Sequence, residues 1–184
     1  KAPKGPKQDP GAIGPMDRRI ISRSPCPVLL LRDIQATAIL AAVALDQRHD
    51  PTLKGDDMLV KFASAVAEIR QVPLHLAHAW DLPDEKILRA VSSDSESEHL
   101  KQKIEKAHQE LLNNLLHRHP ETTATTHLVE GWASHIIPRL VKELNISLLV
   151  IGASQKEKSD YCRLGSISEV ILQQVECSAL IIKP

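Results

Sequence analysis

A polar loop between an apolar strand and a helix carries the residues best suited to bind a phosphate group. The apolar stretch LLVIG ends in Gly152, and the helix that follows the loop begins at Gly165 and Ser166. Free backbone amides and the positive end of the helix dipole favour an anion at a helix N-terminus. Glycine lets the backbone approach such a ligand closely. This order of strand, loop, Gly-Ser and helix is therefore compatible with a phosphate-binding loop.

The same Gly-Ser pair has a second explanation, because serine is a common N-cap residue that bonds the first amides of its own helix. Two further candidates come from other apolar strands: Asp46 follows one of them, and Ala79 lies near the end of the next. In an open α/β sheet, ligands bind beyond the carboxyl ends of the strands. Spacing alone leaves both capping and phosphate binding open.

The histidines and aspartates give no pattern typical of a metal or catalytic site. His75 and His78 lie in one expected strand with side chains on opposite faces, so they cannot chelate one metal ion. Asp56 and Asp57 are interpreted as partners of a helix dipole. No Ser-His-Asp or Cys-His arrangement is indicated, which favours binding over catalysis. Four histidines on a long expected helix lack an i, i+4 pair and are interpreted as a solvated face: His99, His108, His117 and His119.

The elements that must position these residues alternate along the chain. Apolar runs predict strands at 39–45, 74–80, 125–129, 147–151 and 178–182, with helices at 54–70, 95–117, 133–144 and 165–175 between them. Alternation of this kind predicts an α/β fold for residues 38–184, with a five-stranded parallel sheet in the order 3-2-1-4-5 and helices on both faces. Two inward helix faces are expected, Leu59, Phe62, Ala63 and Val66 in one helix and Leu100, Ile104, Ala107, Leu111 and Leu115 in the other.

The chain contains an internal repeat. Residues 14–32 align without a gap on residues 165–183, and Cys26 falls on Cys177. Residues 1–33 are therefore predicted to be the C-terminal remnant of a first domain, with loop, helix and strand, and residues 38–184 a complete second domain. The two repeated strands, 28–31 and 179–182, are expected to pair antiparallel, to bury their apolar side chains and to leave the two cysteines unlinked.

Composition limits the function classes. Lys+Arg and Asp+Glu are both 23, and this balance argues against a general nucleic-acid binder, which needs a basic face. The longest apolar run is too short to cross a bilayer, so no membrane partner is expected. The three cysteines form no disulfide framework, and Cys26 and Cys177 are interpreted as buried, inert thiols. A reducing cytoplasm is the expected location.

The loop after Gly152 resembles the signature of the universal stress protein (UspA-type) family, which reads Gly, two residues, Gly, nine residues and Gly-Ser/Thr. The nine-residue spacing is kept from Lys156 to Leu164, but Gln155 stands at the middle glycine. Asp46, the run HLAHAW, the run EGWASHIIPRL and the final CSALIIKP are also similar to the family, and the likeness covers essentially the whole chain. The repeat is similar to the tandem-domain, E-type branch.

The resemblance implies a Rossmann-like fold of the adenine nucleotide alpha hydrolase type and an ATP ligand. It would place the adenine by Asp46 and Ala79, and the phosphates on Gly152, Ser154, Gly165 and Ser166. A side chain at Gln155 takes up space and φ freedom, so a degenerate site with weak ATP binding is expected.

The expected function is a stress-response protein that acts by binding and association; the alternative is an ATP-binding switch with slow ATPase activity. The expected partner is a second copy, or an upstream domain in a pseudo-dimer, met through strands 28–31 and 179–182.

Overall fold

A computed structural model describes residues 13–32, 35, 37–46, 53–81, 94–153 and 166–183, apart from the side chains of 94–97. Strands and helices alternate through these ranges, as the apolar pattern predicts. None of the helices in the described ranges combines the length and apolarity needed to cross a bilayer.

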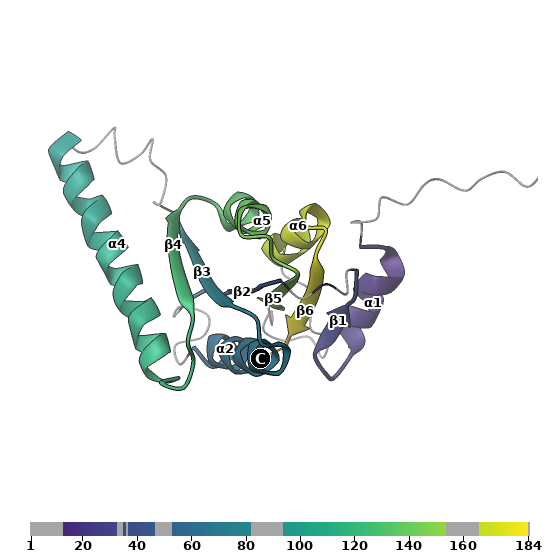
Figure 1. Ribbon diagram of the computed structural model, residues 1–184. Coiled ribbons are helices and arrows are strands. Elements are labelled where there is room, and N and C mark those ends of the chain that lie inside the picture. The colour runs from purple at the N-terminus through teal and green to yellow at the C-terminus, as the bar shows by residue number, and fades with distance from the viewer. Residues whose placement is uncertain are drawn as a thin grey trace, which may run out of the picture.

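The strands form one sheet of six members in the order β1-β6-β5-β2-β3-β4 (Figure 1). Their bounds are β1 Val28–Leu30, β2 Ile39–Ala42, β3 Leu74–Trp80, β4 Thr125–Glu130, β5 Leu148–Gly152 and β6 Ser178–Ile182. Strands β2 to β6 are parallel wherever they pair with one another. The outer strand β1 pairs antiparallel with β6.

This sheet confirms the predicted α/β class, but it differs from the predicted five-stranded parallel sheet in the number and full order of its strands. The difference is β1, which makes the sheet mixed. Free amide and carbonyl groups at the edge of β6 accept another strand readily, and Leu29 lies opposite Leu180 in that pairing. The five parallel strands keep the neighbours that the alternation predicts.

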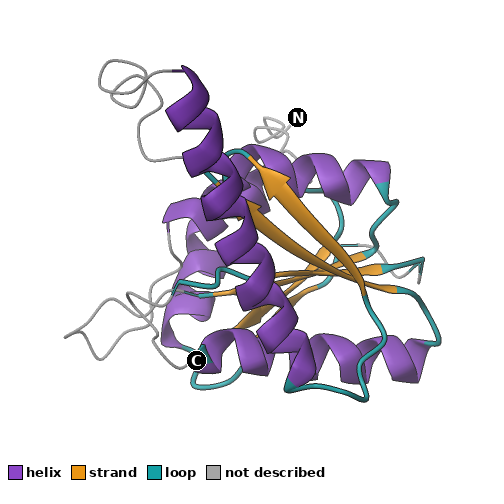
Figure 2. Ribbon diagram, turned by 90° about the vertical axis from the view of Figure 1, so that its left-hand side faces the viewer, coloured by secondary structure: helices purple, strands orange, loops and turns teal. Residues whose placement is uncertain are grey.

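Helices cover both faces of the sheet. On one face lie α1 (Pro15–Arg23), α5 (Ala133–Glu143) and α6 (Ser166–Gln174), whose apolar residues share one core with the strands. On the other face lie α2 (Lys54–Arg70) and α4 (Asp94–His117), which share a second core. Figure 1 shows α4 beside β4 at one end of the sheet and α1 beside β1 at the other. Figure 2 views the molecule from the α4 side, with the strands behind that helix.

Burial of the strands follows their position in the sheet. The first three residues of β2 are buried, since this strand lies in the middle of the sheet and is covered on both faces. The strand is shorter than the predicted 39–45, because the backbone amides of Ala44 and Leu45 donate to a side chain of α2 and not to a neighbouring strand.

The inward helix faces differ in part from the prediction. In α2 the buried positions Leu59, Ala63 and Ala67 form the central stripe, and Phe62 lies at its border with 38% of its surface exposed. In α4 the fully buried residues are Leu112 and Leu115. Of the other expected positions in α4, Ala107 is exposed, and three are half-buried: Leu100, Ile104 and Leu111.

The prediction that all of 28–31 is buried is wrong. Leu29 is 53% and Leu31 60% exposed, because β1 is an edge strand with one face on the core and one on the surface. Cys26 is likewise exposed and Cys177 buried, so the interpretation as a buried thiol holds for Cys177 alone. Both are free thiols, as expected. Cys162 lies outside the described residues.

Candidate functional site

The predicted site residues that the structure describes lie at the carboxyl edge of the parallel strands. Ala79 lies near the end of β3, Asp46 follows β2, and Gly152 ends β5. These three strands are direct neighbours in the sheet. Ser166 is the first residue of α6, which follows β5 in the chain, and it is exposed. The other three predicted positions, Ser154, Gln155 and Gly165, lie outside the described residues.

A buried carboxylate organises the turn that leads to Asp46. The side chain of Asp56 is 6% exposed, and its two oxygens accept hydrogen bonds from the backbone N–H groups of Ala44 at 3.0 Å and Leu45 at 2.9 Å. Leu45 has a φ of 50°, in the left-handed region that costs a branched side chain energy. Asp56 stabilises this turn by binding both of its amides.

Sequence reasoning interpreted Asp56 as a partner of the α2 dipole and missed this role. Asp56 is the third residue of α2. A carboxylate at that position commonly bonds the N-cap amide of its own helix, whereas Asp56 bonds two amides that lie 12 and 11 residues earlier in the chain. Local spacing therefore gives no signal for this role.

Two hydrogen bonds hold the end of β5 in place, one to β6 and one to α6. The backbone N–H of Ala153 donates to the Ile182 carbonyl at 2.8 Å, and the Ser168 hydroxyl donates to the Gly152 carbonyl at 2.8 Å. A Cβ atom added at Gly152 would meet only Leu59 Cδ1, at an ordinary 3.6 Å. Packing within the described part of the chain therefore does not require glycine at this position.

An ion pair at the start of α6 joins a carboxylate of that helix to an arginine of α1. Glu169 lies in the first turn, where a carboxylate would oppose a bound anion. Arg18 of α1 lies 3.1 Å from Glu169, with both side chains partly exposed. This exposed pair contributes little to stability, but it offsets the negative charge at a helix end whose amides favour anions.

A pair of histidines lies near the carboxyl end of β3, on the face of the sheet that α4 covers. His78 Nδ1 lies 3.1 Å from the Val43 carbonyl, and its Nε2 lies 2.9 Å from His108 Nδ1. A carbonyl can only accept, so Nδ1 of His78 carries the proton, and its Nε2 accepts from His108. Trp80 stacks on His108 at 5.9 Å between ring centroids. Burial lowers the pKa of His78 to about 4, with a smaller contribution from His108 and an opposing one from the Val43 carbonyl.

A second histidine pair lies on the opposite face of the sheet. His75 Nδ1 is 3.1 Å from His127 Nε2, and the ring centroids are 5.2 Å apart. Burial lowers the pKa of both rings, and for His127 the neighbouring His75 adds to this. His75 and His78 thus point to opposite faces as predicted, and each meets another histidine, which the sequence did not indicate.

The predicted solvated face of α4 is wrong for His108, which pairs with His78, and for His119, which lies just beyond the helix. His119 is 3% exposed, and its Nε2 lies 2.9 Å from Asp57 Oδ1. Arg118 joins the same carboxylate, with Nε 3.3 Å from Oδ1. Asp57 therefore anchors the end of α4 to α2.

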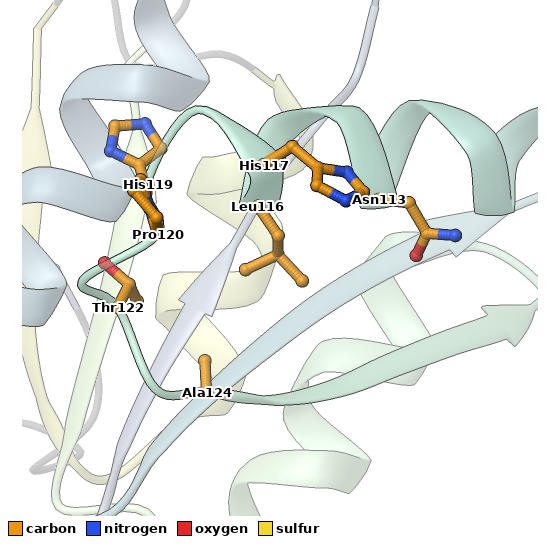
Figure 3. A pocket seen from close by; sticks show the side chains of 7 residues that line it. All are labelled: Asn113, Leu116, His117, His119, Pro120, Thr122 and Ala124. Carbon is orange, nitrogen blue, oxygen red and sulfur yellow. The ribbon is translucent and has the colours of Figure 1, made fainter.

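A pocket of about 330 Å³ lies at the turn between α4 and β4, far from the candidate edge (Figure 3). Leu116 and Ala124 form its apolar side, and His117 and Asn113 lie along the helix above (Figure 3). The turn lies at the amino end of β4, and none of the predicted site residues lines the pocket. Ligands of open α/β sheets bind at the opposite, carboxyl edge.

Comparison with known proteins matches residues 43–183 to the universal stress protein family. The chain is 25% identical over 175 residues to the universal stress protein E homolog of Haemophilus influenzae, covering 92% of this chain and 56% of that protein. The chain thus spans about half the length of the curated relatives it matches.

Two solved structures share the fold. One is a functionally unknown protein of Pseudomonas aeruginosa PAO1, with a TM-score of 0.73 and 24% identity over 99% of this chain and 60% of that one. The other is a universal stress protein of Archaeoglobus fulgidus, with a TM-score of 0.52 and 17% identity over 80% of this chain and 94% of that one.

Proposed function

This chain belongs to the universal stress protein family, and on that premise we propose that it serves the stress response by binding and association, with a degenerate nucleotide site. The observation that carries the proposal is the position of Asp46, Ala79 and Gly152 at or just beyond the carboxyl ends of three neighbouring strands. Binding is favoured over catalysis because two ionisable groups near this edge already serve the structure. Asp56 accepts two backbone amides, and His78 is bonded on both ring nitrogens.

An adenine nucleotide fits the described part of this edge. The backbone at Gly152 is open to close approach, with Leu59 at 3.6 Å from the position of an added Cβ. The exposed start of α6 at Ser166 offers amides to a phosphate. Arg18 offsets the carboxylate of Glu169 in the first turn. The phosphates would lie on Gly152, Ser166 and the loop between them, and the adenine beside Asp46 and Ala79.

Gln155 makes this nucleotide site weak in the proposal, because its side chain replaces a glycine where the loop passes the phosphates. Thermal unfolding with ATP, ADP and AMP tests this. Ligand at a concentration equal to Kd adds only about 0.4 kcal/mol to the free energy of unfolding, and at ten times Kd about 1.4 kcal/mol. We expect little stabilisation of the unmodified protein by millimolar ATP and a clear gain in Gln155→Gly.

The matched control is Gln155→Ala, which removes most of the side chain but keeps the φ restriction. If ATP stabilises only the glycine variant, the weak binding results from the restricted φ angle at this position. If ATP stabilises both variants equally, the weak binding results from the volume of the glutamine side chain. Micromolar ATP affinity in the unmodified protein would show that Gln155 does not degrade the site.

The second candidate is an ATP-binding switch with slow ATPase activity, favoured by the same room at Gly152 and the open start of α6. Nucleotide released from the purified protein by denaturation, followed by slow ADP production from added ATP, distinguishes it from a binding protein. If no nucleotide is released and no ADP is produced, the switch is excluded and the role in binding and association is retained.

The association partner in this proposal is a second copy or an upstream domain of the E-type tandem arrangement. The repeat of 14–32 on 165–183 and the relatives named universal stress protein E support it. In this proposal residues 1–33 close a first domain, residues 38–184 form the second, and the protein works in the cytoplasm. The outer edge of β1, with Leu29 and Leu31 exposed, supplies the contact.

Sedimentation of the unmodified chain and of Leu29→Lys tests the association. We expect a mass that rises with concentration and a reduced association in the variant. Ile69→Lys is the matched control, since Ile69 is 82% exposed and lies on α2, away from strand β1. Equal effects of both variants would indicate nonspecific contact through exposed apolar groups.

A further inference from the structure

We propose that His75 and His127 form a binding site for a divalent transition-metal ion of the zinc class. The two residues come from neighbouring parallel strands, β3 and β4, where His127 lies opposite Ala77. Both rings project from the same face, and Nδ1 of one lies 3.1 Å from Nε2 of the other. Neutral imidazole nitrogens are ligands that zinc, nickel and copper ions accept readily. The inference is independent of the nucleotide site.

The spacing of the two nitrogens suits a shared ion. Zinc binds imidazole nitrogen at about 2.0–2.1 Å, so two nitrogens in a tetrahedral site lie about 3.3 Å apart. The observed 3.1 Å is within a few tenths of an ångström of that separation. The rings are inclined by 46° to each other. When the donor ring moves its proton to its other ring nitrogen, a modest turn of each ring directs both lone pairs at one point, where the ion takes the place of the hydrogen bond.

The pair has room for this movement. β4 is the last strand of the sheet on its side, so His127 has a neighbouring strand on one side only. Both histidines are half-buried, which leaves them open to an ion from solvent.

The other histidine pair is a natural internal comparison. His78 and His108 also approach through ring nitrogens, at 2.9 Å. However, His78 is only 3% exposed, and Trp80 covers a face of His108. Solvent therefore reaches this pair less readily than the pair of His75 and His127, in which both rings are half-buried. The geometry therefore points to the half-buried pair alone.

The proposed site is open. No group of three or more His, Cys, Asp and Glu side chains in the described ranges could hold a metal ion. Water must fill the remaining positions around an ion held by His75 and His127. Open positions are characteristic of exchangeable or catalytic metal sites, whereas structural zinc sites have four protein ligands. We thus expect reversible binding and no dependence of the fold on the metal.

Calorimetric titration of the whole chain with ZnCl₂ at pH 7.5 tests the proposal. We expect one ion per chain, and an affinity at least tenfold lower in His75→Ala and in His127→Ala. His135→Ala is the matched control, because His135 is exposed on α5 and should leave the affinity unchanged. Unchanged affinity in both strand variants, or a loss in the control alone, overturns the site.

A second measurement needs no variant. Imidazole ¹⁵N correlation spectra of the unmodified protein report each ring separately, and zinc should shift the signals of His75 and His127 while those of His78 and His108 stay in place. Shifts confined to other histidines overturn the proposal, even if either variant fails to fold.

Discussion

Replacing His78 by Asn should change how the stability of the protein depends on pH. The Asn side-chain amide can still donate to the Val43 carbonyl, as His78 Nδ1 does. It cannot be protonated, and it does not reach His108. At neutral pH the variant should be less stable by about 1–2 kcal/mol, because it loses one buried hydrogen bond and leaves His108 without that partner.

The pH effect follows from the depressed pKa of His78. Its pKa is about 4 in the folded protein, against an ordinary value of 6.5, mainly because the ring is buried. A folded-state pKa below the unfolded one means that the unfolded chain binds more protons. The stabilisation is then complete above pH 6.5 and is lost as pH falls toward 4. This loss is about 2 kcal/mol at pH 5 and about 3 kcal/mol at pH 4.

Urea unfolding of both proteins between pH 7.5 and 5 measures the effect. The free-energy difference between the unmodified protein and His78→Asn should shrink by about 2 kcal/mol over this interval, and it should reverse sign if the neutral-pH difference is small. Taking the difference removes the contributions of the groups that do not contact His78, such as the surface carboxylates and His75, which both proteins share. Parallel pH curves would refute the reasoning and show that His78 titrates normally in the folded protein.

Two further predictions concern two buried side chains, those of Asp56 and Cys177. Asp56→Ala should destabilise the protein by about 2–3 kcal/mol, since it leaves the buried amide of Leu45 without its acceptor, and amide hydrogen exchange at Leu45 should accelerate. Burial raises the pKa of the Cys177 thiol to about 11, so at pH 8 iodoacetamide should label the exposed Cys26 and leave Cys177 unmodified. Mass spectrometry of the labelled peptides decides this, and rapid labelling of Cys177 in the folded protein would contradict its burial.

Most of the strands and their order in the sheet could be predicted from the pattern of apolar residues. Continuous apolar runs such as that of β2 mark strands covered on both faces, and the handedness of parallel crossovers then restricts their order. The pairing of β1 with β6 was also predictable, because repeated sequences favour repeated structure. The exposure of Leu29 was not, since burial of an edge strand depends on which of its faces the helices cover.

The positions of the candidate site residues could be predicted only where the local sequence determines the end of a strand. Asp46, Ala79 and Gly152 lie at strand ends, so parallel pairing brings them to one edge. The contact of His108 with His78 depends on how α4 is rotated and where it crosses β3, which periodicity does not determine to within one residue. The same limit explains Phe62, which lies at the border of the buried stripe of α2.

The antiparallel pairing of β1 with β6 has a consequence for the order of folding. Val28 pairs with Ile181, about 150 positions later in the chain, so this contact closes a very large loop. During synthesis β1 leaves the ribosome before β6, and this pairing forms only after β6 has been made. The parallel core from β2 to β5 can already form by that time. We therefore expect β1 to dock last and to open first, which makes this edge the most easily exchanged part of the sheet.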